Sequence, residues 1–333
     1  MRISLPLSVR RAAGLAGITC LWVLATAGAQ AFDLQAHRGG RGLAPENTLA
    51  AFTQAIALGV DTLELDVGLS ADGVVVISHD MALNPEHTRD PEGAWLKARG
   101  PLLHELTLAQ LQRYDVGRLQ PESAYGRQFA RQHPVDGQHI PTLAALFDEV
   151  KRLGASRVRF NIETKIDPTR PGDSAPPDAL VDALLEQIDR AGMADRVTIQ
   201  SFDWRTLARV GQRAPGMPRA YLSSPRTLAD ARWTQGLMLA QFGSVPQLVK
   251  AAAGMAGDGS LTWSPSFKDL SAEQVKEAQA LGLKVLPWTV NQRADMARMM
   301  DMGVDGLITD YPDVLRDLMD ERGMSLPPSA TRR

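Results

Sequence analysis

The sequence predicts a closed barrel of eight parallel strands, each followed by a helix. Short apolar segments alternate eight times with segments whose apolar residues recur at helical spacing, and this pattern is typical of a parallel sheet covered by helices. No strand is followed by a glycine-rich loop of the dinucleotide-binding or nucleotide-triphosphate type. At this chain length, a (β/α)8 TIM barrel is therefore favoured over an open doubly wound sheet.

The predicted strands are short and mostly apolar, and they comprise residues 34–38, 62–67, 157–164, 196–201, 219–222, 259–264, 284–290 and 306–309. Predicted helices lie between them, at residues 47–58, 142–153, 179–190, 204–212, 272–281 and 293–302. Asn47 stands at the start of the first helix, where a polar side chain can cap free backbone N–H groups. Glycines of the kind that end helices in a left-handed cap follow four of the others, at Gly154, Gly192, Gly282 and Gly303.

Residues 1–31 are predicted to be a secretory signal peptide. Basic residues precede a mostly apolar stretch from Ala12 to Ala25, and small residues place the cleavage site near Ala29 or Ala31. The apolar stretch is too short for a stable membrane span, so a retained anchor is the less favoured alternative. We expect an exported protein, periplasmic or secreted. Cys20 would leave with the signal, which excludes disulfides and thiolate metal sites from the mature chain.

The charge distribution argues against a nucleic-acid partner. Loss of the signal peptide with its three arginines would take the formal net charge from −2 to −5, and the remaining basic residues are scattered. We expect the barrel domain to span residues 32–320 and a C-terminal tail to span 321–333, disordered from residue 325 onward. We expect no stable membrane insertion after signal removal, and the sequence does not indicate an oligomeric state.

One segment interrupts the alternation of strands and helices. Residues from about 81 to 140 are polar and rich in proline and glycine, with one predicted short helix at 106–114. A structureless connection of this length is improbable in a compact domain. We interpret it as a small insertion module over the C-terminal mouth of the barrel, between the second strand and its helix. Residues 73–78 predict a return strand that leads into it.

Three carboxylates at predicted strand ends form a candidate metal site. Glu64 and Asp66 are two residues apart on one strand, so their side chains share a face, and Glu163 has the equivalent place on a later strand. Barrels place their active sites where these strand ends meet. Three hard oxygen ligands suit one divalent cation, either Ca²⁺ or Mg²⁺.

Basic side chains at the same strand ends suggest that this cation assists chemistry on a phosphate ester. His37 and His79 are the candidate general acid and base, because imidazole can take up or deliver a proton near neutral pH. Which histidine has which role does not follow from the sequence. Arg38 and Lys165 are candidates to bind the phosphate and stabilise its developing charge. Glu46 is predicted to orient Arg38 or a metal-bound water.

In chain order these groups read His37-Arg38-Gly39, Pro45-Glu46-Asn47-Thr48, Glu64-Leu65-Asp66, His79-Asp80 and Glu163-Thr164-Lys165. The series resembles the glycerophosphodiester phosphodiesterase family, and the resemblance covers roughly residues 34–318. It implies metal-dependent hydrolysis of a small-molecule glycerophosphodiester, such as glycerophosphocholine or glycerophosphoethanolamine, to sn-glycerol 3-phosphate and an alcohol. The metal ligands it implies are Glu64, Asp66 and Glu163.

Later landmarks of the resemblance suggest how the substrate is held. Trp288 would line the pocket against the glycerol group, with Phe202 in a similar place, and Asp310 would lie behind the reacting groups at the barrel mouth. Tyr125 and Trp95 of the insertion are candidates for contact with the alcohol. We interpret the remaining histidines as surface or local structural residues: His87, His104, His133 and His139.

Two alternative functions remain. The first is a phospholipase D- or C-like phosphodiesterase acting on intact phospholipid, which would need an apolar rim, whereas the insertion is polar and has no basic amphipathic helix. The second is a non-catalytic periplasmic binding module on the same scaffold. Such a module would tolerate losses among the two histidines and three carboxylates, all of which are present.

Overall fold

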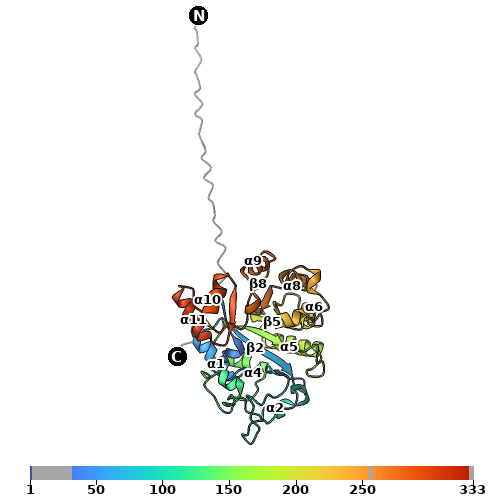
Figure 1. Cartoon of the computed structure of the whole chain (residues 1–333), viewed down its shortest axis with the longest axis vertical. Helices are drawn as coiled ribbons and strands as arrows, with labels where there is room; N and C mark the ends of the chain where they lie inside the picture. Colours follow the sequence, from blue (N-terminus) through green and yellow to red (C-terminus); the bar gives the residue numbers. More distant parts are fainter. Residues whose placement is uncertain (2–31, 255–256, 258, 330–333) are drawn as a thin grey trace. The chain divides into compact units, whose positions relative to one another are not determined.

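A computed structural model of the chain describes residue 1 and residues 32–254, 257 and 259–329 (Figure 1). Apart from Met1, the predicted signal peptide and Cys20 lie outside the described residues. Among the described residues, no helix combines the length and apolar character that a membrane crossing requires.

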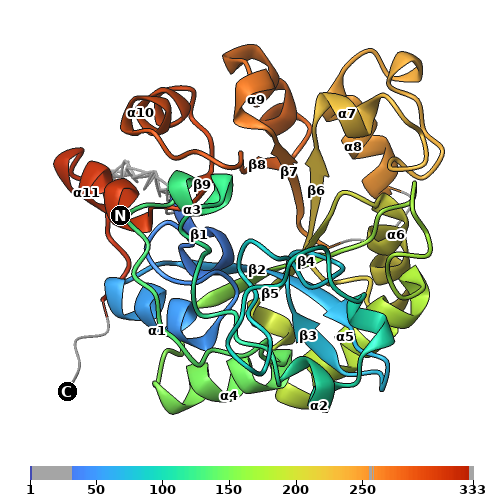
Figure 2. The same cartoon turned by 60° about the horizontal axis from the view of Figure 1, so that its bottom comes forward.

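Eight parallel strands form the central ring (Figure 2). They are β1 Asp33–Ala36, β2 Thr62–Leu69, β4 Arg159–Thr164, β5 Val197–Ser201, β6 Arg219–Ser223, β7 Leu261–Pro265, β8 Lys284–Val285 and β9 Gly306–Thr309. The sheet order is β8-β7-β6-β5-β4-β2-β1-β9. Beyond the end of β8, backbone hydrogen bonds from Ile308 to Pro287 (3.1 Å) and from Val290 to Ile308 (3.0 Å) nearly close the ring. The predicted (β/α)8 barrel is thus confirmed, although its seventh predicted strand is paired as a strand over only two residues.

Helices surround this ring (Figure 2). They are α1 Leu49–Leu58, α4 Leu143–Arg152, α5 Pro177–Ala191, α6 Trp204–Arg213, α8 Val245–Gly254, α9 Ala272–Ala280, α10 Arg293–Asp301 and α11 Pro312–Glu321, with a short α7 at Pro225–Leu228. Helices α7, α8 and α11 were not predicted from the sequence, although α8 and α11 bury apolar residues at helical spacing. The predicted left-handed glycines are confirmed, with φ between +65° and +81° at Gly154, Gly192, Gly282 and Gly303.

The two faces of the strands have different environments. Outward-facing residues such as Leu65 and Phe160 are fully buried in the core beneath the helices, where Phe160 packs edge-to-face on Phe147 of α4 at 5.0 Å. The inner face carries a polar layer in which the Asn161 amide donates to Gln35 and Gln200, both at 2.9 Å. These bonds satisfy polar groups inside the barrel and form the floor of the site described below.

The start of α1 differs from the prediction. Asn47 was expected to cap this helix, but Thr48 is the N-cap, and its hydroxyl accepts a hydrogen bond from the Ala51 N–H. Asn47 instead has a left-handed backbone with φ 56°, and its side chain donates to Asp66 at 3.0 Å. The polar residue before the helix therefore supports a carboxylate of the barrel mouth instead of the helix end.

The insertion is a module with a small apolar core of its own. The return strand β3, Val75–Ile77, pairs antiparallel with β2 as predicted, and the chain then enters η2 Leu103–Glu105, α2 Leu108–Leu111 and α3 Ala124–Gln128. The module attaches to the first barrel loop, because Gln132 donates to the Arg41 carbonyl at 2.7 Å and the His133 N–H to the Leu43 carbonyl at 2.9 Å. Its buried core comprises Val76, Leu83, Leu103, Leu111, Val116 and Ile140.

The described part of the C-terminal tail is held against the barrel. One Arg316 nitrogen donates to the carbonyls of Gly59 and Pro327, both at 2.7 Å, and Leu326 packs against the main core. The expectation of disorder is therefore wrong for residues 325–329, because the Leu326 side chain and the hydrogen bonds from the half-buried Arg316 anchor them. Residues 330–333 lie outside the described residues.

Candidate active site

Three buried carboxylates meet at the C-terminal ends of neighbouring strands. Asp66 on β2 and Glu163 on β4 are direct partners in the strand register, and Glu64 lies two residues earlier on β2, on the same face. One oxygen from each carboxylate lies within 4.8 Å of the others. Burial, together with repulsion from Asp66, raises the pKa of Glu64 well above its usual range and that of Glu163 to about 7.

Asp66 differs from its two neighbours because it has cationic partners. Burial alone would raise its pKa, but Lys165 and Arg38 hold the pKa of this carboxyl well below its usual range. Its Oδ2 accepts a hydrogen bond from Asn47, whereas its buried Oδ1 has no hydrogen-bond partner among the described residues. A buried carboxylate oxygen without a donor, beside two further carboxylates, is a suitable position for a hard cation.

Glu64 is positioned from two sides. The Gln200 amide donates to its Oε1 at 2.6 Å, and the Arg38 backbone N–H donates to its Oε2 at 2.8 Å. Gln200 comes from β5, where it lies beside Glu163 in the register. Gln200 was not assigned to the site from the sequence, although a polar residue at an inward-facing position of a predicted strand could have indicated it.

Arg38 occupies a tight left-handed turn at the end of β1. Its φ is 51°, a conformation that non-glycine residues rarely adopt and that is concentrated at functional sites. The turn leaves no room for a side chain at Gly39, where a Cβ would lie 2.9 Å from the Cβ of Ala51. The Arg38 guanidinium is buried between Glu46 at 2.8 Å and Asp66 at 3.3 Å. The predicted contact between Glu46 and Arg38 is therefore present.

The insertion reaches this arginine through Tyr125 of α3. Its hydroxyl donates to Glu46 and accepts a hydrogen bond of 2.9 Å from Arg41. Burial would raise the pKa of Glu46, but Arg38 lowers it to about 2, so the carboxylate is ionised. Tyr125 was expected to contact the substrate alcohol; in the structure its hydroxyl joins the insertion to the arginine network. Trp95 packs near Arg89 instead.

His37 is held by a carboxylate from the other end of the sequence. Its Nδ1 lies 2.5 Å from Asp310 Oδ1, and Asp310 also accepts hydrogen bonds from Arg41 (2.7 Å) and Asn291 (2.6 Å). Burial would raise the pKa of Asp310, but His37 and Arg41 lower it well below its usual range. An ionised carboxylate only accepts hydrogen bonds, so the His37 proton lies on Nδ1. Its free Nε2 lies 4.0 Å from Glu64.

His79 has a similar partner at closer sequence distance. Its Nδ1 lies 2.9 Å from Asp80, and Asp80 also accepts from Asn84 at 2.6 Å and lies 3.5 Å from His87. Burial lowers the pKa of each site histidine to about 4, assisted by Arg41 at His37 and by Arg38 at His79. Both are therefore neutral at pH 7, and within the described part of the chain the Nε2 of each has no hydrogen-bond partner.

The remaining predicted residues complete the mouth of the barrel. Lys165 lies 2.7 Å from Glu163 and 3.5 Å from Asp66; burial would lower its pKa, but these carboxylates raise it. Trp288 is half-buried, donates from Nε1 to a backbone carbonyl at 2.8 Å, and packs edge-to-face on Phe202 at 5.2 Å. The structure thus brings all the predicted site residues together. Partner residues not assigned to the site from sequence were Arg41, Asp80, His87, Gln200 and Asn291.

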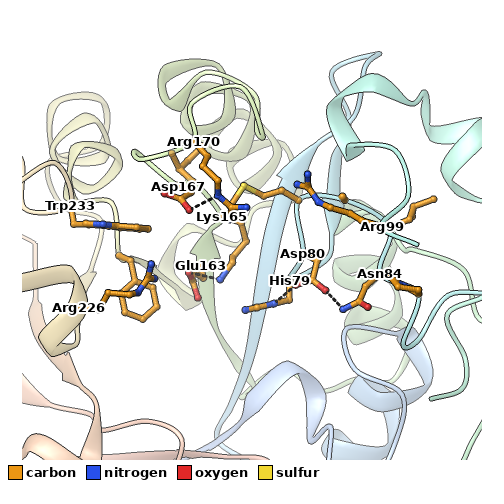
Figure 3. A pocket seen from close by; sticks show the side chains of 16 residues that line it. His79, Asp80, Asn84, Arg99, Glu163, Lys165, Asp167, Arg170, Arg226 and Trp233 are labelled. Atoms are coloured by element: carbon orange, nitrogen blue, oxygen red, sulfur yellow. Dashed lines mark hydrogen bonds and ion pairs between the residues drawn. The ribbon is translucent and has the colours of Figure 1, made fainter. Parts of the chain in front are cut away.

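A cavity of about 500 Å³ opens beside His79, Glu163 and Lys165 (Figure 3). One wall is formed by the insertion, through residues 80–85 and Arg99, and another by the loop after β4. The remaining wall contains Phe202, Arg226 and Trp233. This volume is in the range of small-molecule binding sites.

The whole barrel resembles known proteins. Residues 37–314 match the glycerophosphoryl diester phosphodiesterase family. The chain is 30% identical to a glycerophosphodiester phosphodiesterase of Caldanaerobacter subterraneus over 86% of this chain and 98% of that protein. It is 31% identical to one of Bacillus subtilis over 84% of this chain and 83% of the relative.

Solved protein structures also resemble this chain. A Silicibacter pomeroyi protein assigned to the same family has a TM-score of 0.79 and 36% identity, covering 89% of this chain and 96% of its own. An Oleispira antarctica phosphodiesterase, solved with its product sn-glycerol 3-phosphate, has a TM-score of 0.62 and 24% identity. The likeness covers 86% of this chain and 96% of the Oleispira chain. The second likeness is one of fold.

Proposed function

This chain belongs to the glycerophosphoryl diester phosphodiesterase family and is an enzyme of that type, and we propose that it acts with one divalent cation and two histidines. The observation that carries the proposal is the convergence of three buried carboxylates and two neutral histidines, of which Glu163 and His79 line the cavity. We further propose that the enzyme is exported, on the basis of the signal sequence predicted at residues 1–31.

Glu64, Asp66 and Glu163 would hold the cation. Their oxygens are hard ligands, and Asp66 Oδ1, which lies 3.5 Å from Lys165 but has no hydrogen-bond partner among the described residues, fits a position for such an ion. When bound, the cation would stabilise negative charge on the phosphate oxygens. The three carboxylates are common to Ca²⁺ and Mg²⁺ sites, so the two ions are distinguished by the experiment below.

Arg38 and Lys165 supply positive charge for the phosphodiester. Both side chains are largely buried beside the carboxylates, and charged donors in a site with little water are stronger than in solution. Glu46 and Asp66 hold the Arg38 guanidinium in place, so binding a phosphate there requires little reorganisation.

The histidines would move the two protons that the reaction requires. One neutral imidazole takes the proton of the attacking oxygen at its free Nε2, and the other delivers a proton to the leaving alcohol. A facing phosphodiester anion raises the pKa of a histidine and so favours its acid form. Asp310 and Asp80 fix each Nδ1–H and stabilise the imidazolium that forms. The attacking oxygen belongs either to water or to the glycerol half of the substrate, and a transient cyclic phosphate would identify the second case.

Release of sn-glycerol 3-phosphate tests the proposal. The purified protein is treated with EDTA, then given Ca²⁺ or Mg²⁺ with glycerophosphoglycerol or glycerophosphocholine as substrate. We expect release only after a cation is restored. Release without any cation would contradict the metal role. Absence of release from folded protein with both cations would contradict the substrate class, and intact phospholipid would then be the next substrate.

A further inference from the structure

The cavity beside His79 has a cationic outer wall. Arg99 comes from the insertion, Arg170 from the loop after β4, and Arg226 from α7, and all three line the same cavity (Figure 3). None of them lies among the carboxylates that would hold the cation. Three separate segments of the fold thus place guanidinium groups around the space that extends outward from the phosphate position at Lys165.

The carboxylates of this wall already have partners from within the chain. Asp167 accepts hydrogen bonds from the backbone N–H and the hydroxyl of Thr169, at 2.8 and 2.6 Å, and from Arg170 at 3.0 Å. Arg99 and Arg170 also lie 2.8 and 3.2 Å from Asp173. A cationic substrate group would therefore have to displace these arginines to reach Asp167 or Asp173.

Arg226 differs from the other two arginines. Its guanidinium lies 5.0 Å from the centre of the Trp233 ring, and within the described part of the chain no carboxylate forms an ion pair with it. A guanidinium held over an indole ring by a cation–π contact keeps N–H donors that can bind an anion. The same contact places a positive charge over a ring face that a quaternary ammonium group would otherwise use.

We propose that this cavity receives the alcohol half of the diester, and that Arg226 on its Trp233 support selects alcohols that carry a second anionic group, a phosphate ester or a carboxylate. The inference rests on the proposed function, since the reacting phosphorus must lie near His79 and Lys165. The cavity, at about 500 Å³, has room for such a group beyond the scissile phosphate.

Two matched pairs of substrates test the selection. Bis(glycerophospho)glycerol differs from glycerophosphoglycerol by a second glycerophosphoryl group, which adds a phosphodiester anion to the alcohol, and glycerophosphoserine differs from glycerophosphoethanolamine by a carboxylate. We expect kcat/KM to be about tenfold higher for the anionic member of at least one pair, beyond the factor of two that the two equivalent ends of bis(glycerophospho)glycerol contribute. The pair that shows the preference identifies the anion. No preference in either pair would overturn the proposal.

Substitutions of Arg226 test whether this residue causes the preference for substrates with an additional anionic group. We expect Arg226→Gln to lower, about tenfold, the ratio of kcat/KM for the substrate with the additional anionic group to kcat/KM for the other member of its pair, and Arg226→Lys to retain part of this ratio. Arg232→Gln is the matched control, because Arg232 is an exposed arginine paired with Asp230 and does not line the cavity. An unchanged ratio in Arg226→Gln, or an equal fall in the control, would overturn the assignment.

A binding measurement separates this inference from the proposed function. If the wild-type protein releases sn-glycerol 3-phosphate from none of the four diesters, the proposed function fails. Calorimetric titration of the EDTA-treated protein with bis(glycerophospho)glycerol and glycerophosphoglycerol then decides the subsite. Tighter binding of the former that disappears in Arg226→Gln supports the subsite, and equal binding of both overturns it.

Discussion

The two histidines of the site share one arrangement but lie on parts of the fold that are built differently. His37 follows β1, and its partner Asp310 follows β9, 273 residues later in the chain. His79 follows β3 at the entrance to the insertion, and its partner is the next residue, Asp80. The His37 side chain is 11% exposed and that of His79 is 33% exposed. Burial nevertheless lowers the pKa of both to about 4.

This difference shows two ways of orienting an imidazole. The position of His37 is a property of the closed barrel, because adjacent strands bring it to Asp310, which is fully buried and bound by Arg41 and Asn291 as well. The position of His79 is a property of a local turn, because Asp80 is one-third exposed and held mainly by residues of the insertion. Equivalent substitutions should therefore have unequal effects.

The largest expected effect is common to both regions. His37→Ala and His79→Ala should each reduce kcat by about 10²–10⁴-fold, because each removes a proton-transfer group. Folding, followed by circular dichroism, and calorimetric Ca²⁺ binding should be retained. His139→Ala is the control, since His139 is exposed in the insertion and outside the cavity. Near-normal kcat in either site variant would exclude its acid–base role.

Removal of the partner carboxylates should lower stability and kcat to different extents in the two regions. Asp310→Asn leaves Arg41 without its buried partner and should cost about 3 kcal/mol of stability, with a loss of kcat of about 100-fold. Asp80→Asn should cost less than about 1 kcal/mol and reduce kcat about tenfold. Urea unfolding and steady-state kinetics measure both effects. Equal losses in the two variants would contradict the distinction between a barrel-held and a locally held histidine.

The carboxylates between the two histidines predict a pH-dependent affinity for the cation. The pKa of Glu163 is raised to about 7, first by burial and then by Asp66, and a cation binds the deprotonated form. Below pH 7 protons compete with the ion, so the apparent Kd for Ca²⁺ should rise by up to about tenfold per pH unit lowered. Above pH 7 the contribution of Glu163 disappears, and any further fall in the Kd belongs to Glu64, whose pKa is also raised by burial and by Asp66.

Calorimetric titration with Ca²⁺ between pH 5.5 and 8.5 checks the direction of this change. Glu163→Gln supplies the comparison, because it should bind Ca²⁺ more weakly and with a shallower dependence on pH. A Kd that stays constant across the range, or that falls on acidification, would contradict the assignment of these carboxylates as ligands.

The smallest expected effect concerns the contact that joins the two regions. Tyr125→Phe removes the hydroxyl between Glu46 and Arg41, and we expect a loss of about 1 kcal/mol in stability and a fall of a few-fold in kcat/KM. Tyr114→Phe, in the insertion but outside the cavity, is the matched control and should change kcat/KM less. An equal change in both would indicate that the Tyr125 contact does not transmit the position of the insertion to the site.

Parts of the site could be predicted because the sequence patterns that indicate them involve residues close together in the chain. Glu64 and Asp66 share a face through the two-residue period of a strand, and Glu163 ends another strand in the same register. Arg41 and Asn291 had no such signal, since a polar residue in a loop is compatible with simple solvent exposure. Asn47 was misassigned because capping a helix and supporting Asp66 require the same short polar side chain.

The sequence by itself determined the barrel, the place of the insertion and the types of chemical group at the strand ends, because periodicity and strand endings depend on neighbours in the chain. Only the tertiary structure decided the partners: Asp310 for His37, Tyr125 for Glu46, and Trp233 for Arg226. The physical reason is that hydrogen bonds and ring contacts require atoms within a few ångströms. For residues far apart in sequence, closure of the strand ring and docking of the insertion set those distances.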